Sequence, residues 1–462
     1  MSMYKNKKIA IIGISVEGID AVKYFASIGI HVDCLDRRNE DSLKDTLDVI
    51  KNLKNVDSFR FGESYLKNLS SYDIIVRTPG MLLRALELEK AKNSGCQITS
   101  MTKLFLDICP ASTIGVTGTK GKGTTSTLIA SILKEDGKNV YLGGNVGTPL
   151  LSRVQEMKST DWVVLEMSSF QLEDLHKSPH IAVVLRVTQD HLQNTDPNAS
   201  NFHETRDAYV QAKTQIVRFQ KKDDFAIFCK DDKTSASFAS FTSGKVLHYG
   251  RLTRADSYVR DESTVVLQTE NREIDICTLD AIHLRGAHNL ENIAAATLAG
   301  YVAHVTVDVI IRAVKKFKPL EHRLEFVRKV HGVTYYNDSF STVPEPTIAA
   351  LQSFQEPIVL IIGGTDKGSD FTTLGQILMN RSIRGIIVIG AITKKICTVF
   401  KKSGYEGSLV TGLATMHEIV NRASTLAQNG DVVLLSPACA SFDMFKNYKQ
   451  RGILFKNEVS LL

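Results

Sequence analysis

Short apolar runs rich in valine and isoleucine recur along the whole chain and alternate with longer stretches of helical periodicity. Runs that are short and apolar throughout are typical of strands covered on both faces. Helical stretches lie between many of these runs, so we predict an α/β fold with mainly parallel sheets. The predicted strands are 9–14, 32–35, 74–76, 114–116, 162–165, 181–185, 358–362, 386–389 and 432–435.

The length of the chain, 462 residues, favours about three domains at roughly 150 residues each. A glycine-rich turn near Gly118 belongs to a second domain, and a further break is expected near Lys318 and Pro319. The polar stretch 247–279 alternates short strands with turns, which predicts a peripheral sheet on the central domain. The predicted domains are residues 1–109, 110–319 and 320–462.

Charge and cysteine content narrow the class of partner. The net charge of +6 is modest, and the Lys and Arg residues are spread without a polybasic tail. This distribution suits an anionic small substrate better than nucleic acid. The seven cysteines include no C-x-x-C pair, which argues against a zinc site or a disulfide framework. The apolar run 9–14 is too short to span a membrane, and we expect a monomeric, cytoplasmic protein.

The strongest local signal for chemistry is the stretch from Ile114 to Thr125, where a strand leads into a glycine-rich turn and a helix starting near Thr124. Glycines allow successive backbone N–H groups to converge on phosphate oxygens, and a helix N-terminus favours the same anion. A lysine in the turn supplies a mobile cation. The alternative is a plain strand-to-helix turn. The expected phosphate contacts are Gly118, Thr119, Lys120, Gly121, Lys122, Gly123, Thr124 and Thr125.

This loop departs from the common P-loop pattern. Val116 stands where that pattern has its first glycine, and Gly123 stands where it has Ser or Thr. The shorter G-T-x-G-K loop resembles the Mur ligases, and further segments share the resemblance over nearly the whole chain. These segments are 143–147, 166–173, 190–192, 286–292, 322–323, 337–339, 363–367 and 436–448.

The resemblance to the Mur ligase family implies a Rossmann-like N-terminal domain, a P-loop ATPase-like central domain and a Rossmann-like C-terminal domain. It implies an ATP-dependent, Mg²⁺-assisted ligase that converts a carboxylate into an acyl-phosphate and passes it to an amine. The motifs are most similar to members that add D-glutamate to a UDP-linked muramoyl substrate, UDP-N-acetylmuramoyl-L-alanine. All species on this path are anionic, so Mg²⁺ and fixed cations suit the chemistry.

The resemblance also implies roles for metal-site residues. Glu166 ends a strand and is an oxygen ligand suited to Mg²⁺, and Thr124 offers a hydroxyl in the place that Gly123 leaves. His191 would serve a second metal site, and Lys213 would become an anionic ligand as a carbamate. That modification requires a neutral amine, which burial or nearby positive charge favours. The alternatives are a solvated acid, a structural histidine and an exposed helical lysine.

Further contacts follow from the same resemblance. Asn289 and Asn292 lie one helical turn apart and can both face adenine, while Arg323 and Asp338 match ATP contacts. Around the nucleotide-sugar substrate the expected residues are Glu17, Arg37, Arg38, Gly80, Asn145, Ser168 and Gln171. For D-glutamate they are Thr342, Lys367, Ser441 and Tyr448.

Three departures from the family pattern leave alternatives open. Lys120 replaces a usual Asn, Phe340 replaces a usual Lys, and Glu17 places a negative charge where a hydroxyl is usual. A carboxylate at a helix N-terminus disfavours a neighbouring pyrophosphate. One alternative is a sister ligase with another amino acid or acceptor, although the Rossmann-like N-terminal turn argues against a folate-type acceptor. Another is a non-catalytic nucleotide-binding relative.

Overall fold

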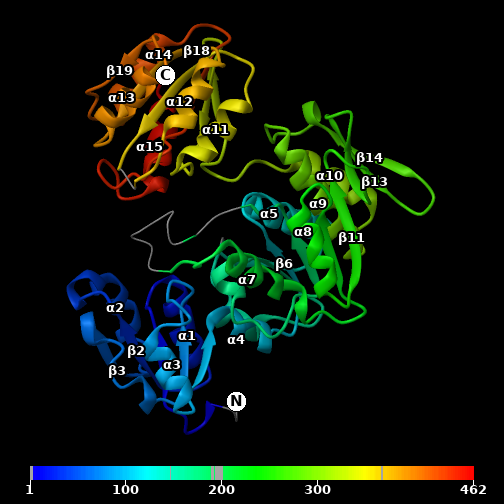
Figure 1. Cartoon of the computed structure of the whole chain (residues 1–462), viewed down its shortest axis with the longest axis vertical. Helices are drawn as coiled ribbons and strands as arrows, with labels where there is room; N and C mark the ends of the chain where they lie inside the picture. The colour runs from blue at the N-terminus through cyan, green and yellow to red at the C-terminus, as the bar shows by residue number, and fades with distance from the viewer. Residues whose placement is uncertain (1–3, 146, 189–191, 193–200, 366–367) are drawn as a thin grey trace. The chain divides into compact units, whose positions relative to one another are not determined.

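The computed structural model describes residues 4–145, 147–188, 192, 201–365 and 368–462 (Figure 1). Three sheets follow one another along the chain, as the apolar runs predict. By contacts, the chain divides into two compact units: Met1–Cys277 with Glu291–Val314, and Thr278–Leu290 with Lys315–Leu462. The domain boundaries at 109/110 and 319/320 stay predictions.

A five-stranded parallel sheet of order β3-β2-β1-β4-β5 comes first (blue in Figure 1). The order reverses at β1, so the loops after β1 and β4 meet at a switch point, where ligands bind in such sheets. Side chains of β1 alternate between two cores, because Ile9 and Ile11 lie in one and Ala10 and Ile12 in the other. Its elements are β1 (Ile9–Ile12), α1 (Val16–Ser27), β2 (Val32–Asp36), α2 (Lys44–Lys51), β3 (Val56–Phe61), β4 (Ile74–Arg77), α3 (Leu86–Asn93), β5 (Gln97–Ser100) and α4 (Met101–Ile108).

The central sheet has nine strands in the order β14-β13-β12-β11-β10-β9-β6-β8-β7. The pairs from β7 through β12 are parallel, and β12 pairs with β13 in the antiparallel sense. Its elements are β6 (Ser112–Thr117), α5 (Lys122–Glu135), β7 (Val140–Gly144), η5 (Leu151–Glu156), β8 (Trp162–Glu166), α6 (Ser169–Leu172), β9 (Ile181–Val184), α7 (Arg206–Arg218), β10 (Phe225–Cys229), α8 (Lys233–Ser237), β11 (Lys245–Gly250), β12 (Ser257–Arg260), β13 (Thr264–Gln268), β14 (Glu273–Thr278), α9 (His288–Val302) and α10 (Val307–Lys316).

The stretch 247–279 forms short strands at the periphery of the central domain, as predicted, but these strands belong to the central sheet and do not make a sheet of their own. Strand β11 pairs with β10 from Phe225↔Lys245 to Cys229↔Tyr249, so β11–β14 extend the central sheet itself. The sheet ends at β14, which is partly exposed along its length.

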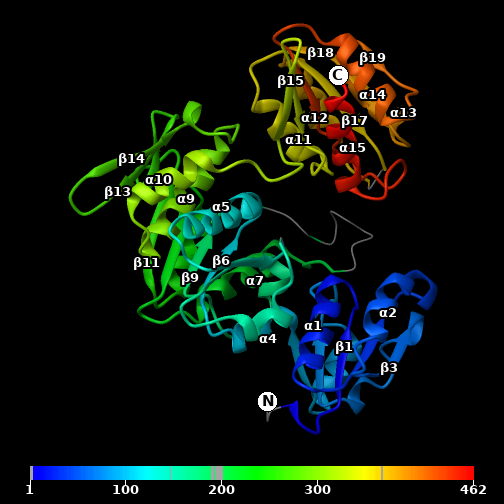
Figure 2. The same cartoon turned by 180° about the vertical axis from the view of Figure 1, so that it is seen from behind.

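The third sheet has six strands in the order β15-β16-β20-β17-β18-β19, all parallel except β15. Helices cover both of its faces (yellow to red in Figures 1 and 2). Ile358, Leu360 and Ile362 of β17 face one core, while Val359 and Ile361 face the other. Its elements are β15 (Glu325–Val330), β16 (Val333–Asn337), α11 (Pro344–Gln352), β17 (Ile358–Gly363), α12 (Thr372–Met379), β18 (Ile383–Ile389), α13 (Thr393–Lys402), β19 (Leu409–Val410), α14 (Met416–Leu426), β20 (Val432–Leu435) and α15 (Tyr448–Ser460).

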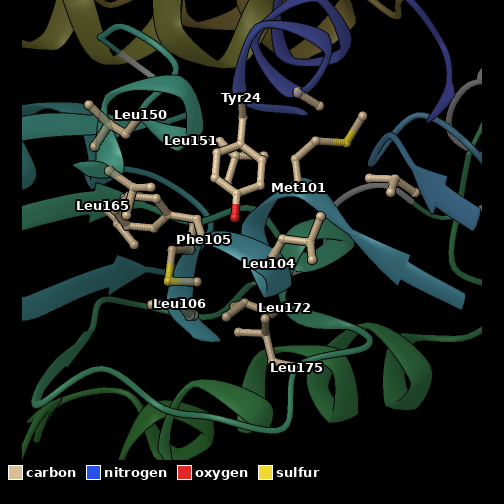
Figure 3. Close-up of a cluster of buried hydrophobic side chains, with 14 of the residues drawn as sticks. Tyr24, Met101, Leu104, Phe105, Leu106, Leu150, Leu151, Leu165, Leu172 and Leu175 are labelled. Atoms are coloured by element: carbon tan, nitrogen blue, oxygen red, sulfur yellow. The ribbon is translucent and has the colours of Figure 1, made fainter. Parts of the chain in front are cut away.

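One apolar cluster joins the first sheet to the central one within the same compact unit. Figure 3 shows Tyr24 of α1, Phe105 of α4, Leu151 of η5 and Leu165 of β8 in this cluster. A polar contact lies beside it, because the buried Asp20 carboxylate accepts bonds from the backbone N–H groups of Leu151 at 2.8 Å and of the next residue at 3.2 Å. The elements that carry the N-terminal and central candidate residues are therefore packed on a shared core. No described helix has the length and apolar character that crossing a bilayer requires.

Candidate functional site

The glycine-rich loop follows β6 and needs glycine at two positions. Gly118 and Gly121 have φ of 142° and 86°, a region that L side chains rarely adopt. A Cβ on Gly118 would lie 2.6 Å from the Cβ of Leu185, and one on Gly121 would lie 2.4 Å from Oδ1 of Asn292. The loop is thus wedged between the end of β9 and helix α9. It leads into α5, whose first-turn N–H groups lack intrahelical acceptors by geometry.

Two lysines reach the same point of this loop. Lys122 is the first residue of α5, and its Nζ donates to the carbonyl oxygens of Gly118 at 3.1 Å and Thr119 at 2.9 Å. Lys213 of α7 is buried, with 1% of its surface exposed. Its Nζ donates to the Gly118 carbonyl at 3.0 Å and to Thr117 Oγ1 at 3.2 Å. The alternative of an exposed helical lysine at 213 is therefore wrong.

Glu166 ends β8, the neighbour of β6, and pairs in register with Val116 just before the loop. The side chain is 4% exposed. Its Oε1 accepts from Nδ2 of Asn145 at 2.9 Å, whereas its buried Oε2 has no hydrogen-bond partner among the described residues. A buried carboxylate oxygen without a donor is costly unless a cation compensates it. This chemistry fits a hard divalent ion such as Mg²⁺.

Further candidates for the phosphates and for adenine lie near the starts of helices α5 and α9. Thr124 is buried in the first turn of α5. Thr125 Oγ1 donates to Oδ1 of Asn292 at 3.3 Å, while Nδ2 of Asn289 donates to the Arg285 carbonyl at 2.7 Å. Lys120 is exposed, and Gly123 is buried in the first turn of α5. His191 and Lys367 lie outside the described residues.

A second chain of contacts links the loop to the segment after β8. Thr119 Oγ1 and the Tyr209 hydroxyl are 2.9 Å apart, and the Tyr209 ring packs edge-on against His203. Nε2 of His203 is hydrogen-bonded to Ser169 Oγ at 2.9 Å, and its ring stacks on Phe170. His203 was not predicted from sequence. Nothing in its spacing marks it, because its partners come from distant segments.

Candidate substrate residues from two sheets meet in the first unit. Ser168 caps α6 through a capping box with Gln171, and Nε2 of Gln171 donates to Oε1 of Glu17 at 2.9 Å. Burial raises the pKa of Glu17, and the Gln171 hydrogen bond partly offsets it. Glu17 lies in the first turn of α1, so a side chain near the N-terminal turn contacts the central domain.

The switch-point turn of the first sheet is held by Asp36, the last residue of β2. Asp36 accepts from the Ile14 N–H at 2.9 Å and forms an ion pair with Arg38 at 2.8 Å. Although burial opposes it, the Arg38 hydrogen bonds lower the pKa of Asp36. Arg37 is exposed beside them, and so is Gly80 in the loop after β4. Of the two arginines predicted for the substrate, only Arg38 has its guanidinium in this ion pair.

In the second unit, Asp338 is buried at the end of β16. Its Oδ2 accepts from Ser341 Oγ at 2.5 Å and Ser436 Oγ at 2.6 Å, and its Oδ1 accepts from the Leu324 N–H at 3.1 Å. Burial raises the pKa of Asp338 to about 6 despite these bonds. The carboxylate thus joins three segments of this unit, and its contact with a ribose stays a prediction.

Tyr448, one of the candidates for the amino acid, forms an aromatic pair with Phe340 in the second unit. The rings of Phe340 and Tyr448 meet edge to face at 5.0 Å, and the Arg323 guanidinium lies 5.7 Å from the Phe340 ring. Ser441 is buried and Thr342 is half-buried. The carbonyl oxygen of Tyr448 accepts from Ser339 Oγ at 2.8 Å.

Arg451 supports this region and was not predicted from sequence. It is fully buried, and its guanidinium donates to Ser339 Oγ at 2.9 Å and to the carbonyl oxygens of Ser339 and Cys439. Burial lowers the pKa of Arg451 to about 10. Nothing in the local sequence indicates that this helical arginine is buried.

Known domain families match the chain in the same three stretches. They are the MurD-like N-terminal domain of Mur ligases over residues 7–100, the Mur ligase middle domain over 116–300, and the Mur ligase glutamate ligase domain over 322–439.

Curated relatives resemble the chain over almost its full length. Two proteins named UDP-N-acetylmuramoylalanine--D-glutamate ligase, from Acetivibrio thermocellus and Symbiobacterium thermophilum, are each 39% identical to it. Both comparisons cover 99% of this chain, and 97% and 98% of the relatives. A protein of the same name from Clostridium tetani is 36% identical, over 98% of this chain and 96% of the relative.

Solved structures share the fold at lower identity. The chain resembles MurF from Acinetobacter baumannii with a TM-score of 0.64 and 14% identity, over 97% of this chain and 93% of that one. It resembles the UDP-N-acetylmuramate-alanine ligase MurC from Thermotoga maritima with a TM-score of 0.60 and 18% identity, over 98% and 100%. It also resembles MurF ligase from Thermotoga maritima in complex with ADP, with a TM-score of 0.58 and 18% identity, over 99% of this chain and 97% of that one.

Proposed function

The chain belongs to the Mur ligase family, and we propose that it joins D-glutamate to UDP-N-acetylmuramoyl-L-alanine at the expense of ATP, in the synthesis of peptidoglycan precursors. Relatives that are 39% identical over 99% of the chain are named UDP-N-acetylmuramoylalanine--D-glutamate ligase. One geometric observation carries the chemistry. The glycine-rich loop and Glu166 stand at the ends of the adjacent strands β6 and β8, with Val116 opposite Glu166. A phosphate cradle and an acid for a metal ion therefore share one edge of the sheet.

The residues present fit magnesium. Oε2 of Glu166, which has no hydrogen-bond partner among the described residues, and the hydroxyl of Thr124, in the first turn of α5, offer oxygen ligands. His191 and Lys213, the latter as a carbamate, complete the proposed set. When bound, Mg²⁺ would neutralise charge on the phosphates and on the acceptor carboxylate.

The chain's own groups then have separate tasks. The loop N–H groups and the N-terminus of α5 hold the terminal phosphates, and Lys122 offsets negative charge on the transferred phosphoryl group. The substrate carboxylate displaces ADP from that group and becomes an acyl-phosphate. The D-glutamate amine attacks the acyl carbon, and phosphate leaves as the amide forms. Positioning supplies much of the rate, since these steps need aligned reactants more than new reactive groups.

Lys213 supports the carbamate proposal by its surroundings. Its amine is buried and shares the Gly118 carbonyl with the Lys122 ammonium. Burial and a neighbouring cation both favour a neutral amine, which is the form that reacts with CO₂. In the second unit we assign Thr342, Lys367, Ser441 and Tyr448 to D-glutamate. A cation and hydroxyls match the two carboxylates of that amino acid.

The test is phosphate release from ATP with Mg²⁺, bicarbonate, the UDP-linked substrate and one amino acid at a time. Release with D-glutamate, and not with L-glutamate, L-alanine, L-lysine or D-alanine, supports the proposal. Release with a different amino acid indicates a sister ligase. If folded protein releases phosphate with none of them, a non-catalytic nucleotide-binding protein is the better description. Lys122→Ala serves as the inactive control.

A further inference from the structure

An ion pair lies behind the phosphate loop, outside the residues assigned above. Arg186 is the second residue after β9, and Glu291 lies in the first turn of α9. Nε of Arg186 donates to Oε1 of Glu291 at 2.8 Å, and the two side chains are 38% and 12% exposed. Both residues belong to the same compact unit as the loop.

The backbone on the Arg186 side of this pair contacts the loop directly. The Thr119 N–H donates to the carbonyl oxygen of Arg186 at 2.8 Å. A Cβ on Gly118 would lie 3.3 Å from that same oxygen, so the loop backbone and the Arg186 peptide are in close contact. Any displacement of Arg186 moves the acceptor of a loop N–H group.

The helix on the Glu291 side contacts the loop at a second point. Asn292 follows Glu291, and its Oδ1 accepts from Thr125 Oγ1 at 3.3 Å. The same oxygen lies 2.4 Å from where a Cβ on Gly121 would stand. The ion pair therefore closes a ring of contacts that runs from the loop through β9 and α9 and back to the loop. Elements β6, β9 and α5 of this ring are labelled in Figure 2.

The groups around the pair favour a fixed ion pair over a metal site. Cys229, Asp231 and Glu291 each offer a ligand atom within 4.8 Å of the others. The Arg186 guanidinium already supplies a cation there, since its Nη2 lies 3.7 Å from Oδ2 of Asp231. Burial, together with the negative charge of Glu291, raises the pKa of the Cys229 thiol to about 12. The thiol is thus neutral and donates to Oε1 of Glu291 at 3.3 Å.

We propose that Arg186 and Glu291 are positioning residues for ATP, which together fix the spacing between the phosphate loop and the adenine-facing turn of α9. This inference rests on the proposed function, because it assigns ATP to that loop. Neither side chain is assigned a contact with ATP. The pair acts through the Arg186 peptide and through Asn292.

The test compares Arg186→Gln, Glu291→Gln and the double variant by KM for ATP, by kcat at saturating ATP, and by calorimetric binding of ADP with Mg²⁺. Each single variant is expected to raise KM and the ADP Kd roughly fivefold, which matches about 1 kcal/mol for a partly exposed pair. The kcat is expected to stay within about twofold. The double variant should resemble either single one, because both remove the same interaction. Arg186→Lys should recover most of the affinity.

Arg312→Gln is the matched control, because Arg312 pairs with Glu135 at 3.4 Å on the surface of the same unit. It should leave every parameter unchanged. A fall in kcat at constant KM, or additive effects in the double variant, would overturn the inference, since a purely structural pair lowers the amount of active enzyme. Wild-type protein that binds no ADP or ATP would instead overturn the proposed function, and this inference with it.

Discussion

The Nζ atoms of Lys122 and Lys213 donate to one acceptor, the Gly118 carbonyl oxygen, at 3.1 and 3.0 Å. Two cations on one carbonyl repel each other unless one gives up its charge or an anion joins them. A carbamate on Lys213 would turn this repulsion into attraction. A bound phosphate would draw Lys122 away from the loop carbonyls. The arrangement therefore suits a site in which Lys213 is modified and Lys122 turns to a ligand.

Lys213→Ala tests this relationship most directly. Without the carbamate ligand, phosphate release should fall at least about hundredfold, the upper range for losing support of a metal site. Binding of ADP should change little, because the loop N–H groups and Lys122 remain. Turnover is measured by phosphate release and binding by calorimetry. Lys222→Ala, which alters an exposed lysine nearby in sequence, should behave as wild type. Full activity of Lys213→Ala would remove the carbamate from the mechanism.

Glu166→Gln tests the metal assignment. The change keeps the size of the side chain and one oxygen but removes the charge that a divalent ion needs. Turnover should fall by about tenfold to a hundredfold, and the Mg²⁺ concentration for half-maximal activity should rise. Asn145→Ala removes the donor to Oε1 and should have a smaller effect in the same direction. An unchanged Mg²⁺ titration in Glu166→Gln would place the metal elsewhere.

Glu17→Gln tests whether the departure at the N-terminal turn weakens substrate binding. Burial raises the pKa of Glu17, and the Gln171 hydrogen bond opposes that shift. Once ionised, the carboxylate repels a nearby diphosphate. Removing its charge should lower KM for the UDP-linked substrate a few-fold, on the order of 0.5–1 kcal/mol, and leave KM for ATP unchanged.

The matched control for that variant is Glu89→Gln, which neutralises an exposed acid on helix α3, between β4 and β5 of the first sheet. Equal effects of both variants on KM would indicate a general charge effect. A higher KM in Glu17→Gln alone would show that the substrate uses the carboxylate as a hydrogen-bond acceptor.

Sequence patterns predicted the strands well because their signal is local. The apolar runs at 9–14 and 358–362 became β1 and β17 with small shifts at the ends, and β1 stops at Ile12 because Gly13 turns the chain at a φ of 85°. The turn from β6 into α5 was equally readable because glycines mark it, although the helix begins at Lys122 and not near Thr124.

Contacts between distant segments were not readable in the same way. Arg186 and Glu291 are 105 positions apart, and Ser339 and Arg451 are 112 apart. No local pattern joins such pairs, and only the fold decides that Lys213 is buried beside Gly118. The same reason explains why the sequence predicted short strands in 247–279 without showing that β11 pairs with β10 of the central sheet.

Asp338→Asn tests the buried carboxylate of the second unit through pH. Burial raises the folded pKa of Asp338 to about 6 from an ordinary 3.8, so the folded state holds this proton more tightly than the unfolded state. The resulting stabilisation is complete below about pH 4 and is lost as pH rises through about 6. It amounts to about 3 kcal/mol as an upper figure.

The Asp338→Asn variant has no titratable group at this position, so its unfolding temperature should fall less than that of wild type between pH 4.5 and pH 7.5. Thermal unfolding of both proteins across that range measures the difference, with Asp370→Asn, an exposed acid of the same unit, as the comparison. Parallel curves for wild type and Asp338→Asn would mean that Ser341, Ser436 and the Leu324 N–H hold the charged form without net cost, contrary to the burial argument.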